Sequence, residues 1–174
     1  IDGWVNVDKY GHFGADVVHD LEQFPWPFDD ETAEEVLLNH VLEHLGQDTD
    51  VFLGIMKELY RVCRAGAGVR IHVPHPRHDD FITDPTHVRA ILPDTLAMFD
   101  LEVNERWRAE KAANTQLAIY TRTDFKMLSA TVTPDDRFKD ASGNVLVSIE
   151  ELLEKARVEL NVIKEYQITL EVRK

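Results

Sequence analysis

Two stretches decide the fold: residues 20–45 read DLEQFPWPFDDETAEEVLLNHVLEHL, and residues 58–76 read ELYRVCRAGAGVRIHVPHP. Each contains a short apolar segment, residues 35–39 in the first and 69–73 in the second, with the length and composition of a strand. The segment between them has the periodicity of a helix. Strands that alternate with helices are typical of a parallel sheet covered by helices, so the sequence predicts an α/β fold.

The helix between these strands is predicted from its apolar stripe and its caps. Five apolar residues recur at helical spacing: Phe52, Ile55, Met56, Leu59 and Cys63. Asp48 to Asp50 supply candidate N-caps, and Gly66 is expected to stop the helix after Arg64. The polar residues that follow the first strand then fall at a strand's carboxyl end, where parallel sheets bind their ligands.

The C-terminal half of the chain contains further strand and helix patterns. Residues 117–120 and 127–133 are predicted strands, and Ser148 with Glu151 forms a capping box that opens a helix. Apolar and polar residues alternate strictly over residues 166–172, which favours a half-exposed antiparallel strand at the edge of the sheet. Such an edge could pair with a second copy of the chain, so a homo-oligomer is one expectation.

Length and charge limit the classes of partner. The chain has 174 residues, of which 44% are hydrophobic, which is sufficient for one domain with a core. Its net charge of −13 would repel nucleic acid, and the basic residues are scattered. The composition therefore predicts a small-molecule substrate rather than RNA or DNA.

Location is predicted from what the sequence lacks. No apolar run approaches the roughly 20 residues that span a bilayer, so no membrane partner is expected. The single cysteine, Cys63, cannot form an internal disulfide. A reducing cytoplasm is the predicted environment.

Five pieces of the sequence, in this order and spacing, resemble a known family. They are GWVNVD (3–8), HDLEQFPWPFDD (19–30), VLLNHVLEHL (36–45), ELYRVCRAGAG (58–68) and DPTHVR (84–89). Over roughly residues 3–100 the chain resembles the class I S-adenosylmethionine (SAM)-dependent methyltransferases of the small-molecule type. The resemblance implies a Rossmann-like, mostly parallel sheet with helices on both faces and an antiparallel C-terminal edge strand, with SAM as cofactor.

One part of the family pattern is missing from residues 1–174. The Gly-rich loop that follows the first strand of the family is absent, and Ile1 stands about where that loop would end. In this fold the first strand is central, and its loss would leave buried backbone groups unpaired at roughly 1–3 kcal/mol each. We therefore expect a single methyltransferase-like domain that lacks its first strand and Gly-rich loop and belongs to a longer chain.

The resemblance assigns the cofactor to four residues at strand ends. Asp8 would bind the ribose hydroxyls of SAM, and Asp20 the adenine amino group. Leu21 would offer a backbone amide to the adenine ring, and Asn39 would lie beside the sulfonium. The structural alternatives are a surface turn at Asp8 and an Asx turn at Asp20.

Five histidines are candidates for contact with the methyl acceptor. A hydroxyl or amine acceptor must lose a proton, for which an imidazole is suited. His40 is the first candidate base, and His44, one turn later on the same predicted helical face, is the second. His75, His78 and His87 are predicted to contact the substrate. A helix hydrogen bond is the alternative for His44.

Two other classes of function stay open. One is a metal-dependent enzyme that uses histidines and aspartates of residues 72–87, since these side chains are ligands for zinc or iron. No HExxH or paired-Cys spacing supports it, so no metal ligand is assigned. The other is a non-catalytic methyltransferase-like module. The acceptor and its reacting atom are not determined by the sequence.

Overall fold

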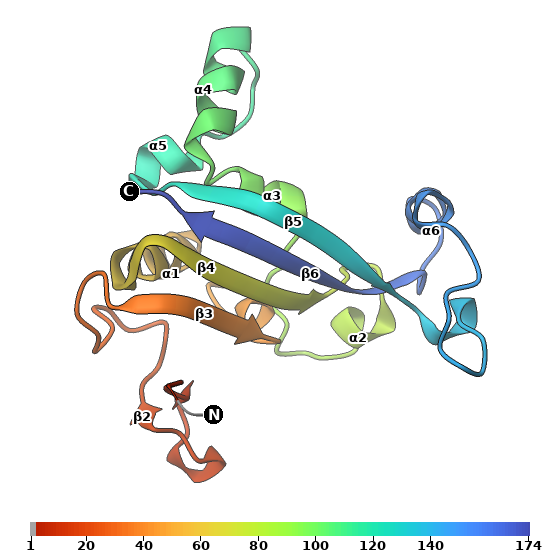
Figure 1. The fold of residues 1–174 in the computed structure, drawn as a ribbon, viewed down its shortest axis with the longest axis horizontal. Helices are drawn as coiled ribbons and strands as arrows, with labels where there is room; N and C mark the ends of the chain where they lie inside the picture. The colour runs from red at the N-terminus through yellow and green to blue at the C-terminus, as the bar shows by residue number, and fades with distance from the viewer. Residues whose placement is uncertain (1–2) are drawn as a thin grey trace.

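The computed structural model describes residues 3–174, which form short strands and helices around one mixed sheet (Figure 1). The strands are β1 (Val7–Asp8), β2 (Val17–Val18), β3 (Ala33–Asn39), β4 (Cys63–Pro74), β5 (Phe125–Pro134) and β6 (Ile163–Val172). The α-helices are α1 (Thr49–Val62), α2 (Asp79–Ile82), α3 (Pro93–Ala97), α4 (Leu101–Glu110), α5 (Leu117–Thr121) and α6 (Ile149–Ala156). Three 3₁₀ turns complete the chain: η1 (Gly11–Phe13), η2 (Leu42–His44) and η3 (Asp136–Phe138).

The main sheet has four strands in the order β3-β4-β6-β5. β3 and β4 are parallel, with Val36 opposite Val69 and Asn39 opposite His72. β6 is antiparallel to both of its neighbours, β4 and β5. β1 and β2 form a separate parallel pair below β3 in Figure 1. The predicted α/β architecture and the antiparallel direction of the C-terminal strand are confirmed.

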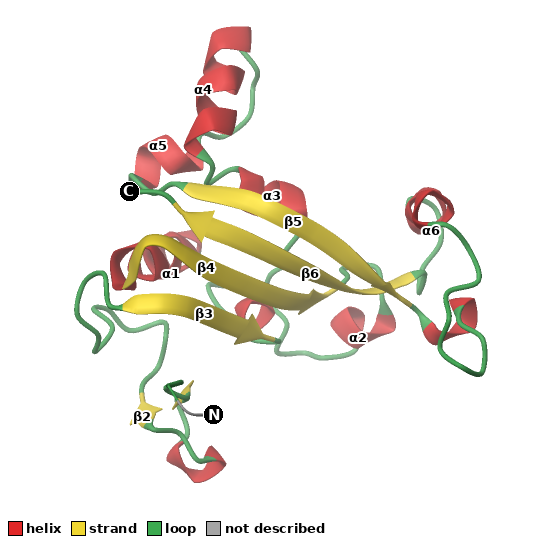
Figure 2. Ribbon diagram, in the orientation of Figure 1, coloured by secondary structure: helices red, strands yellow, loops and turns green. Residues whose placement is uncertain are grey.

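One face of the main sheet carries the core. Ile71, Ile168 and Leu170 are fully buried and belong to one apolar cluster with Ile55 and Leu59 of α1. Helix α1 lies behind the sheet in the view of Figure 2, and its N-cap is Asp48, whose carboxylate accepts from the Asp50 amide. On the opposite face, side chains such as those of Leu37 and Gln167 are exposed.

The predicted edge position of the C-terminal strand is wrong. β6 lies between β4 and β5, and β5 forms the edge of the sheet. The alternation over residues 166–172 arises because Ile168, Leu170 and Val172 face the core while the intervening residues face away from it. Alternation reports the two faces of a strand and carries no information about its lateral neighbours. β6 therefore has no free edge for a second copy of the chain.

Two local predictions also need correction. Residues 117–120 form part of helix α5, not a strand, since a short apolar run has no periodicity that separates the two. Helix α1 ends at Val62, before the predicted stop at Gly66, because the chain enters β4 at Cys63, opposite Ala33 of β3. Gly66 lies inside β4 with φ +77°, a conformation that glycine adopts freely.

The loop that joins β2 to β3 is tied to helix α1. The Arg61 guanidinium donates to the backbone carbonyls of Trp26 and Phe28 and to the Glu58 carboxylate. Glu58 in turn accepts from the Trp26 amide at 2.6 Å. These bonds place the loop, with Trp26 buried, along the helix. None of the helices among residues 3–174 is long and apolar enough to cross a membrane.

Candidate functional site

A groove of about 1140 Å³ runs along the free edge of β3. Its walls are residues 4–7 of the N-terminal segment, residues 33–39 of β3, and side chains of the connecting loop, including Trp26 and Phe28. β3 pairs only with β4, and β1 pairs only with β2, so each of these strands has an edge without a sheet partner in the described chain. The groove thus separates two sheets whose facing strands are both incomplete.

Two of the predicted cofactor residues line this groove, and two do not. Leu21 and Asn39 are part of its wall. Asp8 and Asp20 lie outside it, at the carboxyl ends of the neighbouring strands β1 and β2. The His19 amide donates to the Asp8 carbonyl at 3.0 Å, which brings these two strand ends together.

Both aspartate side chains also bond to their own turns. Asp8 accepts from the Tyr10 amide at 2.7 Å, and Asp20 accepts from the Glu22 amide at 3.0 Å. These are the turn contacts that the structural alternative predicted. Each bond uses one carboxylate oxygen, Oδ1, so the second oxygen of each side chain is not used by its turn.

His40 has an unusual backbone at the point where the chain leaves β3. Its φ is 53°, a left-handed conformation that costs a residue with a Cβ atom roughly 1–2 kcal/mol. Its amide donates to the His72 carbonyl at 2.9 Å. The imidazole lies between two carboxylates, with Nε2 2.9 Å from Glu165 Oε2 and Nδ1 3.3 Å from Glu43 Oε1. This half-exposed ring is thus held in place at the carboxyl end of a strand.

His44 lies in a different environment from His40. The prediction that both share one helical face is wrong, because the 3₁₀ turn begins only at Leu42 and His40 precedes it. His44 Nδ1 is 2.9 Å from the Thr86 hydroxyl, and its ring lies 4.5 Å from that of His87 between centroids. The structure therefore joins His44 to the loop of residues 84–89, which follows α2.

His75 is one of the three predicted substrate residues, and it is buried. Its ring lies 5.1 Å from that of Tyr166 between centroids, and its Nδ1 accepts from the Arg77 amide. Burial, together with the nearby charges of Arg77 and His78, lowers the pKa of His75 to about 4. The ring is therefore a neutral packing element at neutral pH.

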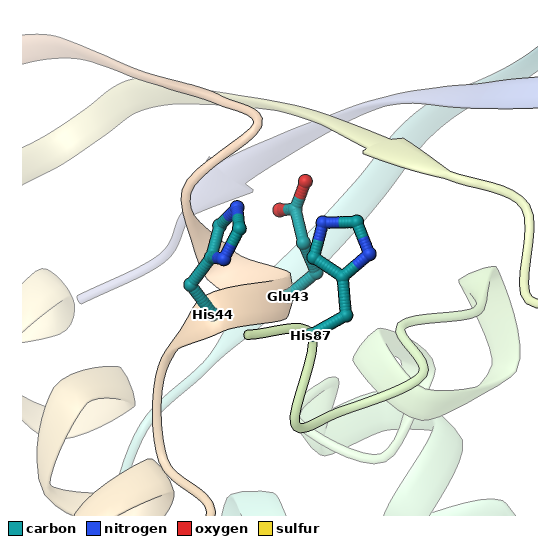
Figure 3. A group of neighbouring side chains, drawn as sticks. All are labelled: Glu43, His44 and His87. Carbon is teal, nitrogen blue, oxygen red and sulfur yellow. The ribbon is translucent and has the colours of Figure 1, made fainter. Parts of the chain in front are cut away.

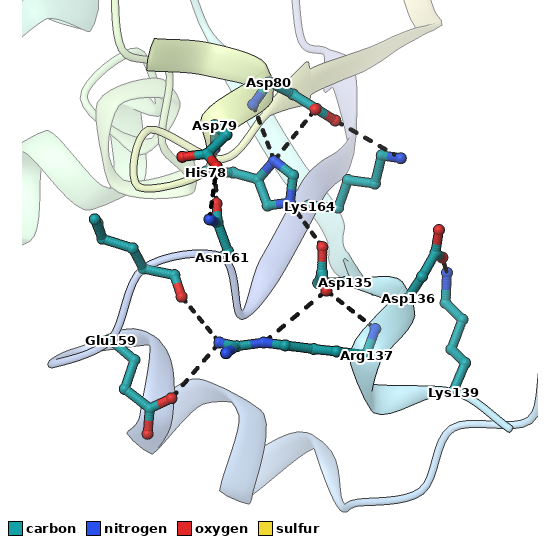
Figure 4. A network of polar contacts seen from close by, with 11 residues as sticks. His78, Asp79, Asp80, Asp135, Asp136, Arg137, Lys139, Glu159, Asn161 and Lys164 are labelled. Carbon is teal, nitrogen blue, oxygen red and sulfur yellow. Dashed lines mark hydrogen bonds and ion pairs between the residues drawn. The ribbon is translucent and has the colours of Figure 1, made fainter. Parts of the chain in front are cut away.

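His78 is buried in a polar network that joins three loops (Figure 4). Its Nε2 lies 3.0 Å from Asp135 Oδ2, and its Nδ1 accepts from the Asp80 amide as the N-cap of α2. Burial alone would raise the pKa of Asp135, but the hydrogen bonds with His78 and with the Arg137 amide outweigh burial, and the pKa is lowered. Both ring nitrogens are used within the protein, which leaves none for a substrate.

The metal cluster suggested for residues 72–87 does not form. The extended segment sends each histidine to a different partner: His72 Nδ1 lies 3.1 Å from Asn39 Oδ1, while His75 and His78 bond as described above. The one group of potential metal ligands close enough together in residues 3–174 is Glu43, His44 and His87 (Figure 3). Only His87 of the predicted cluster takes part in it.

Two glutamates near these histidines were not predicted as site residues. Glu43 is an acid placed between apolar residues of the quoted VLLNHVLEHL motif, a signal of burial that could have identified it. Glu165 lies in β6, far from His40 in the sequence, and no local pattern connects the two. Only the antiparallel pairing of β4 with β6 brings Glu165 to the end of β3.

Comparison with known proteins identifies the fold. No family model and no curated protein matches the sequence. A SAM-dependent methyltransferase structure from Archaeoglobus fulgidus matches 96% of this chain and 75% of its own length, with a TM-score of 0.60 and 19% identity. One from Methanosarcina mazei matches 89% of this chain and 65% of its own length, with a TM-score of 0.47 and 12% identity. The first likeness confirms the predicted Rossmann-like class I SAM-dependent methyltransferase fold.

Proposed function

We propose that this chain acts in SAM-dependent methyl transfer to a small-molecule or glycan-like acceptor. The observation that carries the proposal is the position of the predicted residues at strand ends: Asp8 closes β1, Asp20 follows β2, and Asn39 closes β3 directly before His40. Ligands of open α/β sheets bind at this kind of position, outside the carboxyl ends of the strands. The methyltransferase fold supports SAM as the ligand.

The cofactor residues are proposed from the strand ends. Asp8, at the end of β1, and Asp20, two residues beyond the end of β2, would accept hydrogen bonds from the ribose and the adenine amino group. The Leu21 amide would donate to the adenine ring, and Asn39 would lie near the methionine part. SAM supplies an activated methyl group on a cationic sulfur. Holding the acceptor in line with that group provides much of the catalysis.

His40 is the proposed proton acceptor for the methyl acceptor. Its ring is half exposed at the end of β3, its Nε2 is hydrogen-bonded to Glu165, and its Nδ1, which makes no hydrogen bond in the described chain, would receive the proton, with Glu43 beside it stabilising the imidazolium that forms. Among the three histidines predicted to contact the acceptor, His87 keeps its Nε2 outside the hydrogen bond that its Nδ1 makes with the Phe81 carbonyl. The charge of −13 supports an acceptor that is not nucleic acid. The cytoplasmic location stays a prediction.

The proposal includes one more strand in the same domain. The free edges of β1 and β3 face a common groove, and a parallel strand there would pair with both. Such a strand would complete one continuous sheet and satisfy the backbone groups at both edges. The Gly-rich loop that the family resemblance implies would follow this strand.

Calorimetric titration of SAM into the 174-residue chain, and into the polypeptide that its gene encodes, tests the function. We expect binding, and we expect Asp8→Ala to weaken it about 10- to 100-fold through loss of charge-assisted hydrogen bonds. Asp29→Ala, at an exposed loop carboxylate outside the site, is the matched control and should bind SAM normally. His40→Ala should bind SAM but lose methyl transfer. If neither polypeptide binds SAM, the proposed enzymatic function is wrong and a non-catalytic methyltransferase-like module is favoured.

A further inference from the structure

Glu43 is a fully buried carboxylate without a hydrogen-bond donor. Its side chain is 1% exposed, and neither Oε1 nor Oε2 has a hydrogen-bond partner in the described chain. The half-exposed His40 ring lies closest among possible ion-pair partners in residues 3–174, with Nδ1 3.3 Å from Oε1 but without hydrogen-bond geometry. A buried polar group left in this state costs stability unless something else satisfies it. The carboxylate thus points to a missing positive partner.

Two imidazoles lie beside this carboxylate. Figure 3 shows the Glu43 carboxylate between the rings of His44 and His87. Ligand atoms of the three side chains all lie within 4.8 Å of one another. Glu43 and His44 come from the 3₁₀ turn after β3, and His87 comes from the loop that follows α2.

Hydrogen bonds fix both imidazoles in the form that binds metal. His87 Nδ1 lies 2.9 Å from the Phe81 carbonyl, which only accepts, so in the neutral ring Nδ1 carries the proton and Nε2, 3.8 Å from Asp84 Oδ2, keeps its lone pair. The Thr86 hydroxyl donates to Asp84 Oδ1 at 2.6 Å and therefore accepts from His44 Nδ1. His44 Nε2 then also keeps its lone pair. Outer partners of this kind orient the histidine ligands of metal sites.

The loop that carries His87 is held against the turn that carries Glu43. The amides of Val88 and Arg89 both donate to the Glu43 carbonyl. The Arg89 guanidinium donates to the Gly46 carbonyl and lies 4.4 Å from the Phe52 ring centroid. The three side chains are therefore brought together by a fixed backbone arrangement.

We propose that Glu43, His44 and His87 bind a divalent first-row transition-metal ion, with Zn²⁺ as the representative ion. Two imidazoles and one carboxylate suit zinc and its neighbours, whereas Mg²⁺ and Ca²⁺ prefer oxygen ligands alone. Three protein ligands leave a position open for water or for an oxygen atom of a ligand. This site does not depend on SAM binding and can be tested separately from it.

The test is metal binding by the tag-free 174-residue chain. Calorimetry with Zn²⁺ should give one equivalent bound, and Co²⁺ should give visible d–d absorption that Zn²⁺ displaces. Glu43→Gln and His87→Ala should each weaken Zn²⁺ binding by about 100-fold or more, and Thr86→Val, which removes only the outer partner of His44, by about 10-fold. His72→Ala is the matched histidine control and should bind Zn²⁺ as the unaltered chain does.

Folding is checked separately from binding. Circular dichroism without metal should be unchanged in Thr86→Val and His87→Ala, and Zn²⁺ should raise the thermal midpoint of the unaltered chain but not that of His87→Ala. Equal Zn²⁺ affinity in the unaltered chain and in both ligand variants would overturn the site. So would the absence of Zn²⁺ and Co²⁺ binding by the folded, unaltered chain, whatever its affinity for SAM.

Discussion

Four histidines lie in the segments that follow strands β3 and β4 of the main sheet. They form two pairs that differ in what surrounds the histidine rings. His75 and His78 are buried: His75 packs on Tyr166 and accepts from the Arg77 amide through Nδ1, while His78 has Asp135 at Nε2 and the amide and carboxylate of Asp80 at Nδ1. His44 and His87 each use one nitrogen for a hydrogen bond and surround a carboxylate, that of Glu43, that has none. We refer to His75 and His78 as the satisfied pair, and to His44 and His87, which flank the unsatisfied Glu43 carboxylate, as the open pair.

The comparison teaches that residue type alone does not separate a structural histidine from a functional one. A satisfied buried polar group contributes to stability, and an unsatisfied one lowers it. The satisfied pair is therefore expected to stabilise the fold. The Glu43 carboxylate beside the open pair is expected to lower the stability of the metal-free protein. Three measurements can sharpen or break this distinction.

The largest expected effect is on the pH dependence of stability through His75. Its pKa is lowered to about 4 from an ordinary value of 6.5, so the unfolded chain takes up a proton first as the pH falls. The stabilisation is complete above pH 6.5 and is lost progressively toward pH 4. It amounts to about 3 kcal/mol in total. Urea unfolding at a series of pH values, compared with His75→Phe, measures it. A variant with unchanged pH dependence would contradict the assignment.

The next effect concerns His78, the other member of the satisfied pair. His78→Ala removes the partner of the Asp80 amide and one partner of the Asp135 carboxylate, which keeps the bond from the Arg137 amide. We expect a loss of about 2 kcal/mol in the free energy of unfolding. His19→Ala, at a partly exposed histidine bonded to one carbonyl, is the control and should change stability little. Zn²⁺ binding should persist in His78→Ala. Loss of Zn²⁺ binding in this variant would mean that the satisfied pair also takes part in the metal site.

The smallest effect is a gain of stability at Glu43. Glu43→Met replaces a buried carboxylate that has no hydrogen bond by an apolar side chain of similar size. We expect the metal-free protein to become more stable by about 1 kcal/mol, while Zn²⁺ no longer stabilises it. Denaturant unfolding without Zn²⁺ measures the stability of the metal-free variant, and unfolding with Zn²⁺ measures the stabilisation by the metal. A clear loss of stability in the metal-free variant would show that Glu43 supports the fold itself.

Local patterns in the sequence were sufficient for several elements. The N-cap half of the predicted capping box was confirmed, since Ser148 Oγ accepts from the Glu151 amide at the start of α6. Helix α4 was not predicted, because its sequence is strongly polar and only Asn104 is buried in it. There, burial of one amide side chain against Met98 and Ala118 replaces an apolar stripe.

Only part of the candidate site was predicted from the sequence. The resemblance selected Leu21 and Asn39, which line the groove. The chemistry of imidazole selected His40, whose left-handed backbone no propensity predicts. The grouping of His87 with His44 and Glu43 was not predicted, because it depends on how the loop after α2 folds back onto the turn after β3. Loop packing of this kind has no periodicity in the sequence.

The sequence by itself determined the alternation of strands and helices, the helix caps and the class of fold, because hydrophobic period and capping chemistry act between residues close in the chain. Tertiary structure decided that β6 lies inside the sheet, that Glu165 reaches His40, and which histidines are satisfied. Lateral strand order and loop contacts depend on residues far apart in the chain. The free energy of each such contact depends on the rest of the core, so strand order and loop contacts are decided only when the whole core forms.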